Sequence, residues 1–260
     1  MELELSGKKA LITGASKGIG RATAEALAAE GCDLILVSRT EADLAKVKSS
    51  IEKKAKVEIA IEAVDLSQSG VADQLAEDYP DTDILVNNAG AIPGGPLHLV
   101  DEATWRRAWD LKVYGYINMC RSFYDRMKAR QAGTIINIIG NAGDTRDPAY
   151  ICGVAANAAL TAFSQSLGST SWHDGVRILA INPGPVATDR MKNLMRTKLE
   201  QAGELVPADE ALFQNMPFGR AGRPQEIAAA VCFLASGVSA YNSGSVMTID
   251  AGLSVRGSFG

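Results

Sequence analysis

The sequence predicts a single α/β domain over residues 1–260, in which a doubly wound, seven-stranded parallel sheet carries helices on both faces. Short runs rich in Ile, Leu and Val alternate with amphipathic segments along the whole chain. Strands that are buried on both faces give such apolar runs, and their alternation with helices indicates right-handed βαβ units. No linker, low-complexity tract or internal repeat divides the chain, and open sheets often reach this length undivided.

The expected strands share this apolar character and are bounded by turn residues. They are, in chain order, KKALIT (8–13), DLILVS (33–38), VEIAIEAVD (57–65), DILVNN (83–88), GTIINII (133–139), VRILAIN (176–182) and SVMTID (245–250). The first helix, in GRATAEALAAEG, is expected to end at Gly31, because glycine commonly closes a helix in the left-handed conformation.

Two segments fall outside this alternation. Residues 191–222 are long and mixed in composition, which favours a mobile substrate loop, with a plain surface insertion as the alternative. The last nine residues, GLSVRGSFG, are expected to run over the surface or into a neighbouring subunit.

The composition excludes several classes of function. A net charge of −4 argues against a nucleic-acid or anionic-membrane surface, and no apolar run reaches the roughly 18 residues of a membrane span. The acidic N-terminal segment lacks the pattern of a signal peptide, so we expect a cytoplasmic protein. Cys32, Cys120, Cys152 and Cys232 form no CxxC pair, which favours buried thiols over disulfides or zinc, and no metal site is predicted.

A glycine-rich loop, TGASKGIGRA, joins the first strand to the first helix. Its glycines let the backbone approach a pyrophosphate, whose charge then faces the helix N-terminus. The loop therefore predicts a dinucleotide site of the Rossmann type, although a tight turn without a ligand is the alternative reading of its unusual spacing. The expected contacts come from Gly14, Ser16, Lys17, Gly18, Ile19 and Gly20.

The ends of the next two strands indicate which dinucleotide binds. Arg39 stands where many Rossmann folds place an acid for the ribose 2′-hydroxyl, and with Lys17 it would instead meet a 2′-phosphate. NADP(H) is therefore preferred and NAD(H) remains possible, while the alternative is two solvated surface cations. Asp65, followed by Leu66, is placed to accept from the adenine amino group. Helix N-capping is the alternative role of Asp65, and Ser67 could fill it as well.

Three motifs together resemble the short-chain dehydrogenase/reductase family: TGASKGIG, NNAG (87–90) and NPGPVATD (182–189). Their order and separation match that family over essentially the whole chain. The resemblance implies hydride transfer to or from a nicotinamide cofactor and a homo-oligomer, either tetramer or dimer. It also implies that Asn88, Ala89 and Gly90 line the adenosine ribose. The nicotinamide half would be held by Ile138, Asn157, Pro183, Gly184, Val186 and Thr188.

The family's chemistry normally rests on an Asn, a Ser, a Tyr and a Lys. The tyrosine exchanges the proton, and the lysine four residues later lowers the tyrosine pKa and binds the nicotinamide ribose. This sequence departs from that pattern at each position. Lys112 stands at the asparagine, Ile139 and Gly140 at the serine pair, Gly153 at the tyrosine and Asn157 at the lysine.

The spacing supports this register, because Gly153 follows Gly140 by thirteen residues, the usual distance from serine to tyrosine. Aligning Tyr150 with the tyrosine instead would place Val154 at the lysine. The Tyr-x-x-x-Lys pair is therefore absent in either register.

Two residues are candidates for substitute catalysis. Tyr150 lies about one helical turn from the expected tyrosine, and its alternative role is that of a packed helix-cap residue. Lys112 could bind the nicotinamide ribose, polarise a carbonyl or extend to solvent. Cys152 is read as a core thiol, with an activated thiolate as the alternative.

Four other polar residues carry weaker signals. Asn141 and Asp144 lie on the expected substrate-entry loop, and the sequence offers no partner for Asp144. His98 and His173 are expected on the surface.

These observations predict an atypical NADP(H)-dependent oxidoreductase that exchanges hydride with a small carbonyl or alcohol. The alternatives are a catalytically inactive NADP(H)-binding subunit or sensor, and a non-redox lyase or hydrolase-type enzyme on the same fold. A small-molecule substrate is expected, without nucleic-acid or membrane partners.

Overall fold

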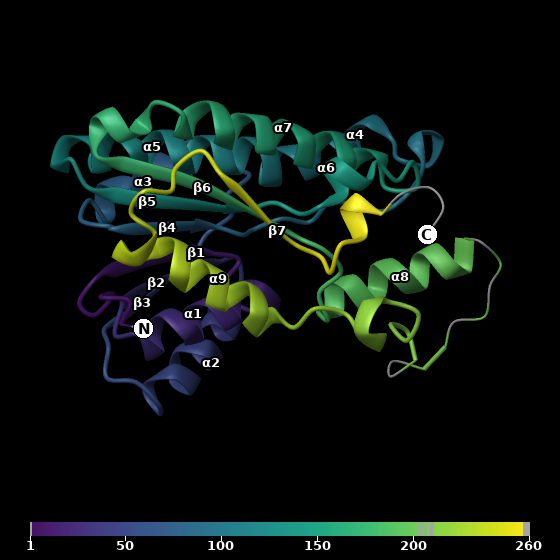
Figure 1. The fold of residues 1–260 in the computed structure, drawn as a ribbon, viewed down its shortest axis with the longest axis horizontal. Helices are drawn as coiled ribbons and strands as arrows, with labels where there is room; N and C mark the ends of the chain where they lie inside the picture. The colour runs from purple at the N-terminus through teal and green to yellow at the C-terminus, as the bar shows by residue number, and fades with distance from the viewer. Residues whose placement is uncertain (1, 202, 204, 206, 209–210, 257–260) are drawn as a thin grey trace.

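The computed structural model describes residues 2–201, 203, 205, 207–208 and 211–256. Within them, seven parallel strands form one sheet in the order β3-β2-β1-β4-β5-β6-β7 (Figure 1). The strands are β1 (Lys9–Thr13), β2 (Asp33–Ser38), β3 (Ile59–Ala63), β4 (Ile84–Asn87), β5 (Gly133–Ile138), β6 (Val176–Pro183) and β7 (Val246–Ile249). The predicted fold class is confirmed, and each expected strand lies within two residues of its observed bounds.

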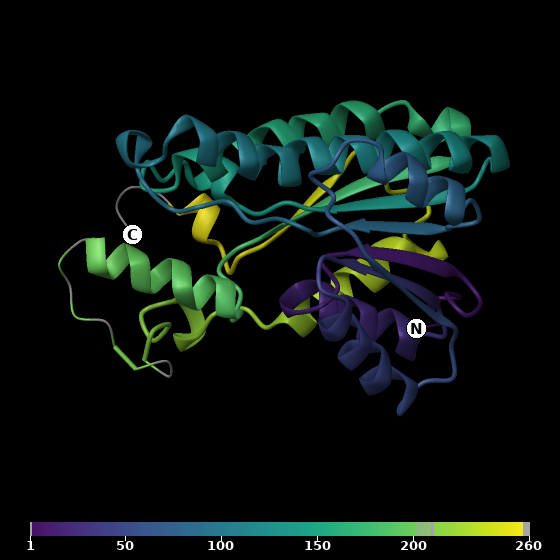
Figure 2. The same ribbon diagram turned by 180° about the vertical axis from the view of Figure 1, so that it is seen from behind.

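Helices cover both faces of the sheet (Figures 1 and 2). One face carries α1 (Gly18–Ala29), α2 (Glu41–Glu52) and α9 (Pro224–Ala235). The other carries α3 (Val71–Asp78), α4 (Glu102–Trp109), α5 (Gly115–Arg130), the short α6 (Ala142–Thr145) and α7 (Ile151–Gly168). The remaining helix, α8 (Asp189–Gln201), lies beyond the carboxyl end of the sheet.

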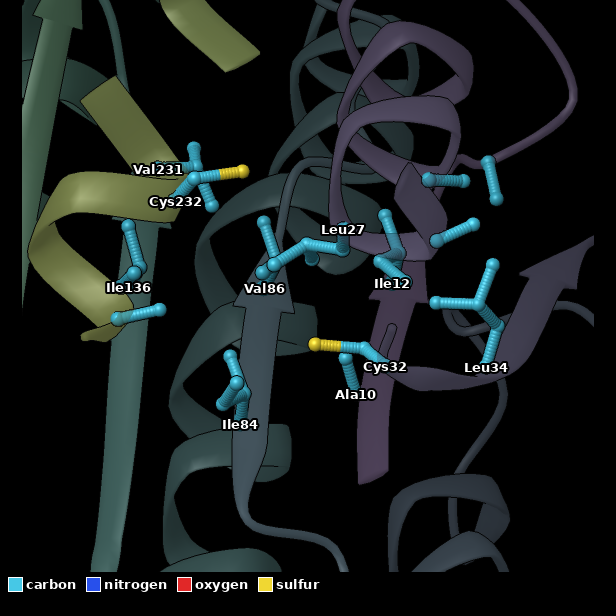
Figure 3. Close-up of a cluster of buried hydrophobic side chains, with 14 of the residues drawn as sticks. Ala10, Ile12, Leu27, Cys32, Leu34, Ile84, Val86, Ile136, Val231 and Cys232 are labelled. Carbon is cyan, nitrogen blue, oxygen red and sulfur yellow. The ribbon is translucent and has the colours of Figure 1, made fainter. Parts of the chain in front are cut away.

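The core beneath α1 and α9 shows why the apolar runs of the sequence form strands. Alternate residues of β1 and β4 point toward these helices, and their side chains exclude water (Figure 3). Leu27 of α1 lies at the centre of this cluster and is fully buried. The cluster also contains Ala10, Ile12, Ile84, Val86, Ile136, Val231 and the thiols of Cys32 and Cys232.

The order of the strands reverses between β1 and β4, and hydrogen bonds fasten their carboxyl ends together. The Thr13 hydroxyl accepts from the backbone N–H groups of Asn88 and Ala89, at 2.9 and 3.0 Å. The Asn88 side chain donates to the carbonyl oxygen of Thr13 at 3.0 Å and to that of Gly14 at 3.3 Å. In an open α/β sheet this reversal opens a crevice where ligands bind, so these bonds fix the floor of the candidate site.

The local predictions had mixed outcomes. Gly31 follows the end of α1 with a φ of +84°, as expected for the glycine that closes a helix. The 191–222 segment begins inside α8 rather than as a loop, and it rejoins the domain through a bridge between Gly222 and Val186. Residues 202, 204, 206 and 209–210 of that segment, and 257–260 of the C-terminal one, lie outside the described residues.

The expected state of the cysteines is confirmed, because the four thiols are buried and unpaired. In the described part of the chain, no helix has both the length and the apolar character of a membrane span. Those same residues hold no cluster of three or more side chains suited to a metal ion.

The core predicts a contrast between two leucines. Leu27→Ala should lower the free energy of unfolding by about 2–5 kcal/mol, because it leaves a cavity at the centre of the cluster. Leu97→Ala should change it by less than about 0.5 kcal/mol, because Leu97 is 68% exposed. Urea denaturation measures both, and equal losses would contradict this assignment of the core.

Candidate active site

A cavity of about 390 Å³ opens at the carboxyl ends of β4, β5 and β6, between α7 and α8. Its volume lies within the range of small-molecule sites. Many residues singled out in the sequence meet here, although they come from distant parts of the chain. They are Ile19, Asn88, Gly90, Lys112, Ile138, Gly140, Tyr150, Asn157, Pro183, Gly184, Val186 and Thr188.

The other predicted cofactor residues lie outside the cavity lining. They are Gly14, Ser16, Lys17, Gly18, Gly20, Arg39, Asp65, Leu66 and Ala89. Five of them belong to the glycine-rich segment that runs from the end of β1 into the first turn of α1, where Gly14 and Gly18 have φ values of +66° and +57° that favour glycine. A Cβ on Gly20 would lie 2.3 Å from the Gly14 carbonyl oxygen, so the loop packs too closely for any side chain there.

The ends of β2 and β3 present charged groups near this loop. Arg39 and Lys17 are both exposed. The Asp65 carboxylate accepts from the backbone N–H of Ser67 at 3.0 Å and from its hydroxyl at 2.8 Å, and these bonds lower the Asp65 pKa. The N-cap of α3 is Gly70, so the alternative in which Asp65 or Ser67 caps that helix is wrong. Leu66 is buried in the core.

Tyr150 forms the N-cap of α7, and its ring packs against the helix at Gly153. A Cβ built on Gly153 would lie 2.0 Å from the Tyr150 Cε1 atom, so the ring occupies the space where a side chain at 153 would begin. The Tyr150 hydroxyl accepts a hydrogen bond of 3.1 Å from the Nη2 atom of Arg190 in α8. Burial raises the pKa of Tyr150, and the Arg190 charge acts in the opposite direction.

Arg190 was not predicted as a site residue. Its guanidinium donates to the carbonyl oxygens of Gly90 at 2.7 Å and Ile92 at 3.1 Å, in addition to Tyr150. Its position directly after NPGPVATD was the only signal that the sequence offered. The structure thus adds a cation to the cavity wall.

Lys112 lies in a π-helical turn, Asp110–Tyr114, between α4 and α5. Such insertions are frequent at functional sites. Its Nζ donates to the Ile139 carbonyl oxygen at 2.6 Å and lies 5.6 Å from the centre of the Tyr116 ring. The alternative that Lys112 extends to solvent is therefore wrong. Burial, with repulsion from Arg190, lowers the pKa of Lys112 to about 7.

Asn157 and Gly140 contact each other across the cavity floor. The Asn157 Nδ2 atom donates to the Gly140 carbonyl oxygen at 3.2 Å, whereas its buried Oδ1 atom has no hydrogen-bond partner among the described residues. Gly140 has a φ of +127°, which disfavours any other residue in this conformation. The floor of the cavity therefore offers one unused acceptor.

The remaining candidates are explained by packing or by local hydrogen bonds. Asp144 accepts from the Asn182 side chain at 3.2 Å, which corrects the expectation that it has no partner. Asn141 donates to Asp250 at 3.1 Å. Cys152 is fully buried and burial raises its pKa, so the core-thiol interpretation is confirmed. His98 and His173 are exposed, as expected.

Comparisons with known proteins agree with this architecture. Residues 8–199 match the short chain dehydrogenase family. Galactitol 2-dehydrogenase (L-tagatose-forming) of Cereibacter sphaeroides is 33% identical over 253 residues, which cover 96% of each chain. A 3-oxoacyl-(acyl-carrier-protein) reductase of Haemophilus influenzae is 30% identical over 96% of this chain and 99% of its own.

Among solved structures, L-sorbose reductase from Gluconobacter frateurii, complexed with NADPH and L-sorbose, superimposes with a TM-score of 0.89. It is 29% identical, and the match covers 98% of this chain and 100% of that one. The chain therefore belongs to the short-chain dehydrogenase family and has the single-domain fold of such oxidoreductases.

The environment of Lys112 predicts a dependence of stability on pH. With its pKa lowered to about 7, folded Lys112 is neutral at pH values where the unfolded chain stays protonated, up to the ordinary value of 10.5. The free energy of unfolding should therefore rise with pH between these values, and Lys112→Met should remove that contribution.

Denaturation of wild type and variant at several pH values between about 7 and 9.5 measures this difference. Lys46→Met, on the exposed surface of α2, should behave as wild type. Parallel curves for wild type and Lys112→Met would contradict the burial of this amine.

Proposed function

We propose that this protein is an NADP(H)-dependent oxidoreductase that exchanges hydride with a small carbonyl or alcohol at a non-standard active site. The observation that carries the proposal is the position of the cavity, which adjoins the glycine loop at the reversal of strand order. This is where open α/β sheets bind dinucleotides.

The residues present fit a nicotinamide dinucleotide. The close-packed glycines leave backbone N–H groups at the N-terminus of α1 free of side-chain obstruction, as a pyrophosphate requires. At the other end of the site, the unpaired Oδ1 atom of Asn157 is a suitable acceptor for a ribose hydroxyl. Val186 and Thr188 line the same cavity and would hold the nicotinamide amide.

The exposed cations at the glycine loop support NADP(H) over NAD(H). Arg39 follows β2 directly, and Lys17 begins α1. Both side chains are exposed, and the Arg39 charge acts on the Asp65 carboxylate after β3, so we propose that both cations bind a 2′-phosphate. A guanidinium can hold a phosphate by two parallel hydrogen bonds.

The active site is proposed to lack the family's usual four residues. Gly153 and Asn157 would stand at the tyrosine and lysine positions, Gly140 at the serine and Lys112 at the asparagine. When bound, NADPH would supply the hydride. Tyr150 and Lys112 are the proposed catalytic residues, because each brings a proton-bearing atom to the cavity wall. A lysine whose pKa is about 7 can both give and take a proton near neutrality.

The outer wall of the cavity supports a small substrate with an apolar part. Met191, Leu194, Met195 and Met216 line it, all from the 191–222 segment, which we propose acts as a mobile substrate loop. Flexible methionine side chains adapt to differently shaped apolar groups. We further propose a homo-oligomer, either tetramer or dimer, on the family resemblance, and a cytoplasmic location.

A second function is an NADP(H)-binding subunit or sensor without turnover. It is favoured by the absence of a side chain at Gly153 and of a cation at Asn157. Fluorescence titration with NADPH should show binding for both functions. Oxidation of NADPH with a panel of ketones and aldehydes should occur only for the oxidoreductase. An absence of binding at millimolar cofactor would overturn both.

The cofactor preference predicts a selective effect of Arg39. Arg39→Ala should weaken NADPH binding roughly tenfold or more, because a charged hydrogen bond to the 2′-phosphate is lost. NADH binding should be unchanged, because NADH has no such phosphate. Calorimetric titration with both cofactors measures this, and Arg106→Ala on exposed α4 is the matched control. Equal losses for the two cofactors would argue against the proposed contact.

A further inference from the structure

The Tyr150 hydroxyl has one open hydrogen-bonding direction. It accepts from Arg190 at 3.1 Å and lines the cavity. A phenol that accepts from a guanidinium must direct its own proton elsewhere, because Arg has no acceptor. The cavity is the space beside it that a substrate oxygen could enter. Its ring lies in the space where a side chain at Gly153 would begin.

Arg190 is held in position by three separate elements. Arg190 belongs to α8. Its guanidinium donates hydrogen bonds to the backbone carbonyl oxygens of Gly90 and Ile92, which follow β4. It also donates a hydrogen bond to the Tyr150 hydroxyl at the start of α7. Two carbonyl anchors fix the orientation of the planar group, and the remaining N–H contact is aimed at Tyr150. The guanidinium is therefore oriented toward the phenol oxygen.

We propose that Arg190 is the positioning residue for Tyr150, and that this Tyr–Arg pair is the proton donor and acceptor of the site. The proposal rests on the proposed oxidoreductase function. Tyr150 would contact the substrate oxygen, and Arg190 would act through Tyr150 by stabilising its phenolate.

The proton balance in the direction of reduction is simple. As the carbonyl carbon receives hydride, its oxygen takes the phenolic proton, so that a C–H and an O–H bond form while the Tyr150 O–H bond breaks. The phenolate is left paired with Arg190 and regains a proton from solvent. In the oxidation direction, the phenolate takes the alcohol proton while hydride leaves the carbon.

The charged surroundings support this assignment. Arg190 and Lys112 are the cations that line the cavity in the described residues, and Asp147 is an acid in the same wall. Cys152 is the other titratable neighbour of Tyr150. Burial raises the pKa of Tyr150 above its ordinary value, and the Arg190 charge offsets part of that rise, which favours the phenolate. Removal of Arg190 should therefore move the Tyr150 titration to higher pH.

The first experiment measures that titration without cofactor. Near-ultraviolet absorbance reports phenolate formation, and the contribution of Tyr150 is the difference between each protein and its Tyr150→Phe counterpart. Arg190→Gln should shift the Tyr150 midpoint upward, and Arg190→Lys should shift it less. Arg196→Gln, which removes an arginine from the same helix outside the cavity lining, should leave it unchanged. An unchanged midpoint in Arg190→Gln would overturn the pair.

The second experiment measures turnover against pH. Tyr150→Phe should lower kcat by about 10²–10⁴-fold. Arg190→Gln should displace the pH profile for alcohol oxidation to higher pH and lower kcat near neutrality more than it changes KM. If the wild-type protein turns over and Tyr150→Phe has the same kcat, this inference is overturned, whereas the oxidoreductase function stands. If wild type binds NADPH without turnover, the oxidoreductase function fails, and the titration still decides whether Arg190 tunes Tyr150.

Discussion

The contact between the Tyr150 ring and the backbone at Gly153 is the constraint from which the geometry of this site follows. A side chain at 153 would meet the ring at 2.0 Å, so the two cannot coexist in this arrangement. With glycine there, the phenol lies against α7 and reaches both the cavity and α8. Gly153 thus leaves the space that the Tyr150 ring occupies.

Two cations share this cavity, and their separation depends on backbone carbonyls. Lys112 is held by Ile139 after β5, and Arg190 is held by Gly90 and Ile92 after β4. Their mutual repulsion is one reason that the pKa of Lys112 is lowered to about 7, and burial is the larger reason. When Lys112 loses its proton, only one of the two groups carries a positive charge, which removes their repulsion.

Strand alternation and glycine spacing were sufficient to predict the sheet and the glycine loop, whereas Lys112 and Asn157 were placed in the site from the family resemblance. Strand alternation and glycine spacing depend on local sequence periodicity and on the geometry of parallel strands. Arg190 could not be predicted, because its role depends on how α8 returns across the strand ends. The Asp144–Asn182 hydrogen bond could not be predicted either, because its partners are 38 positions apart in the sequence and meet only in the folded chain. The sequence also could not show that the Tyr150 ring occupies the space of a side chain at position 153, because this depends on the conformation of Tyr150.

A structure of the protein with NADPH and a ketone analogue tests the account most directly. The nicotinamide ring should lie against the loop after β6, near Val186 and Thr188. The Tyr150 hydroxyl should lie within about 3.2 Å of the analogue oxygen, with Arg190 still bonded to the phenol. A Tyr150 hydroxyl turned away from that oxygen, with Lys112 or another group in its place, would contradict it.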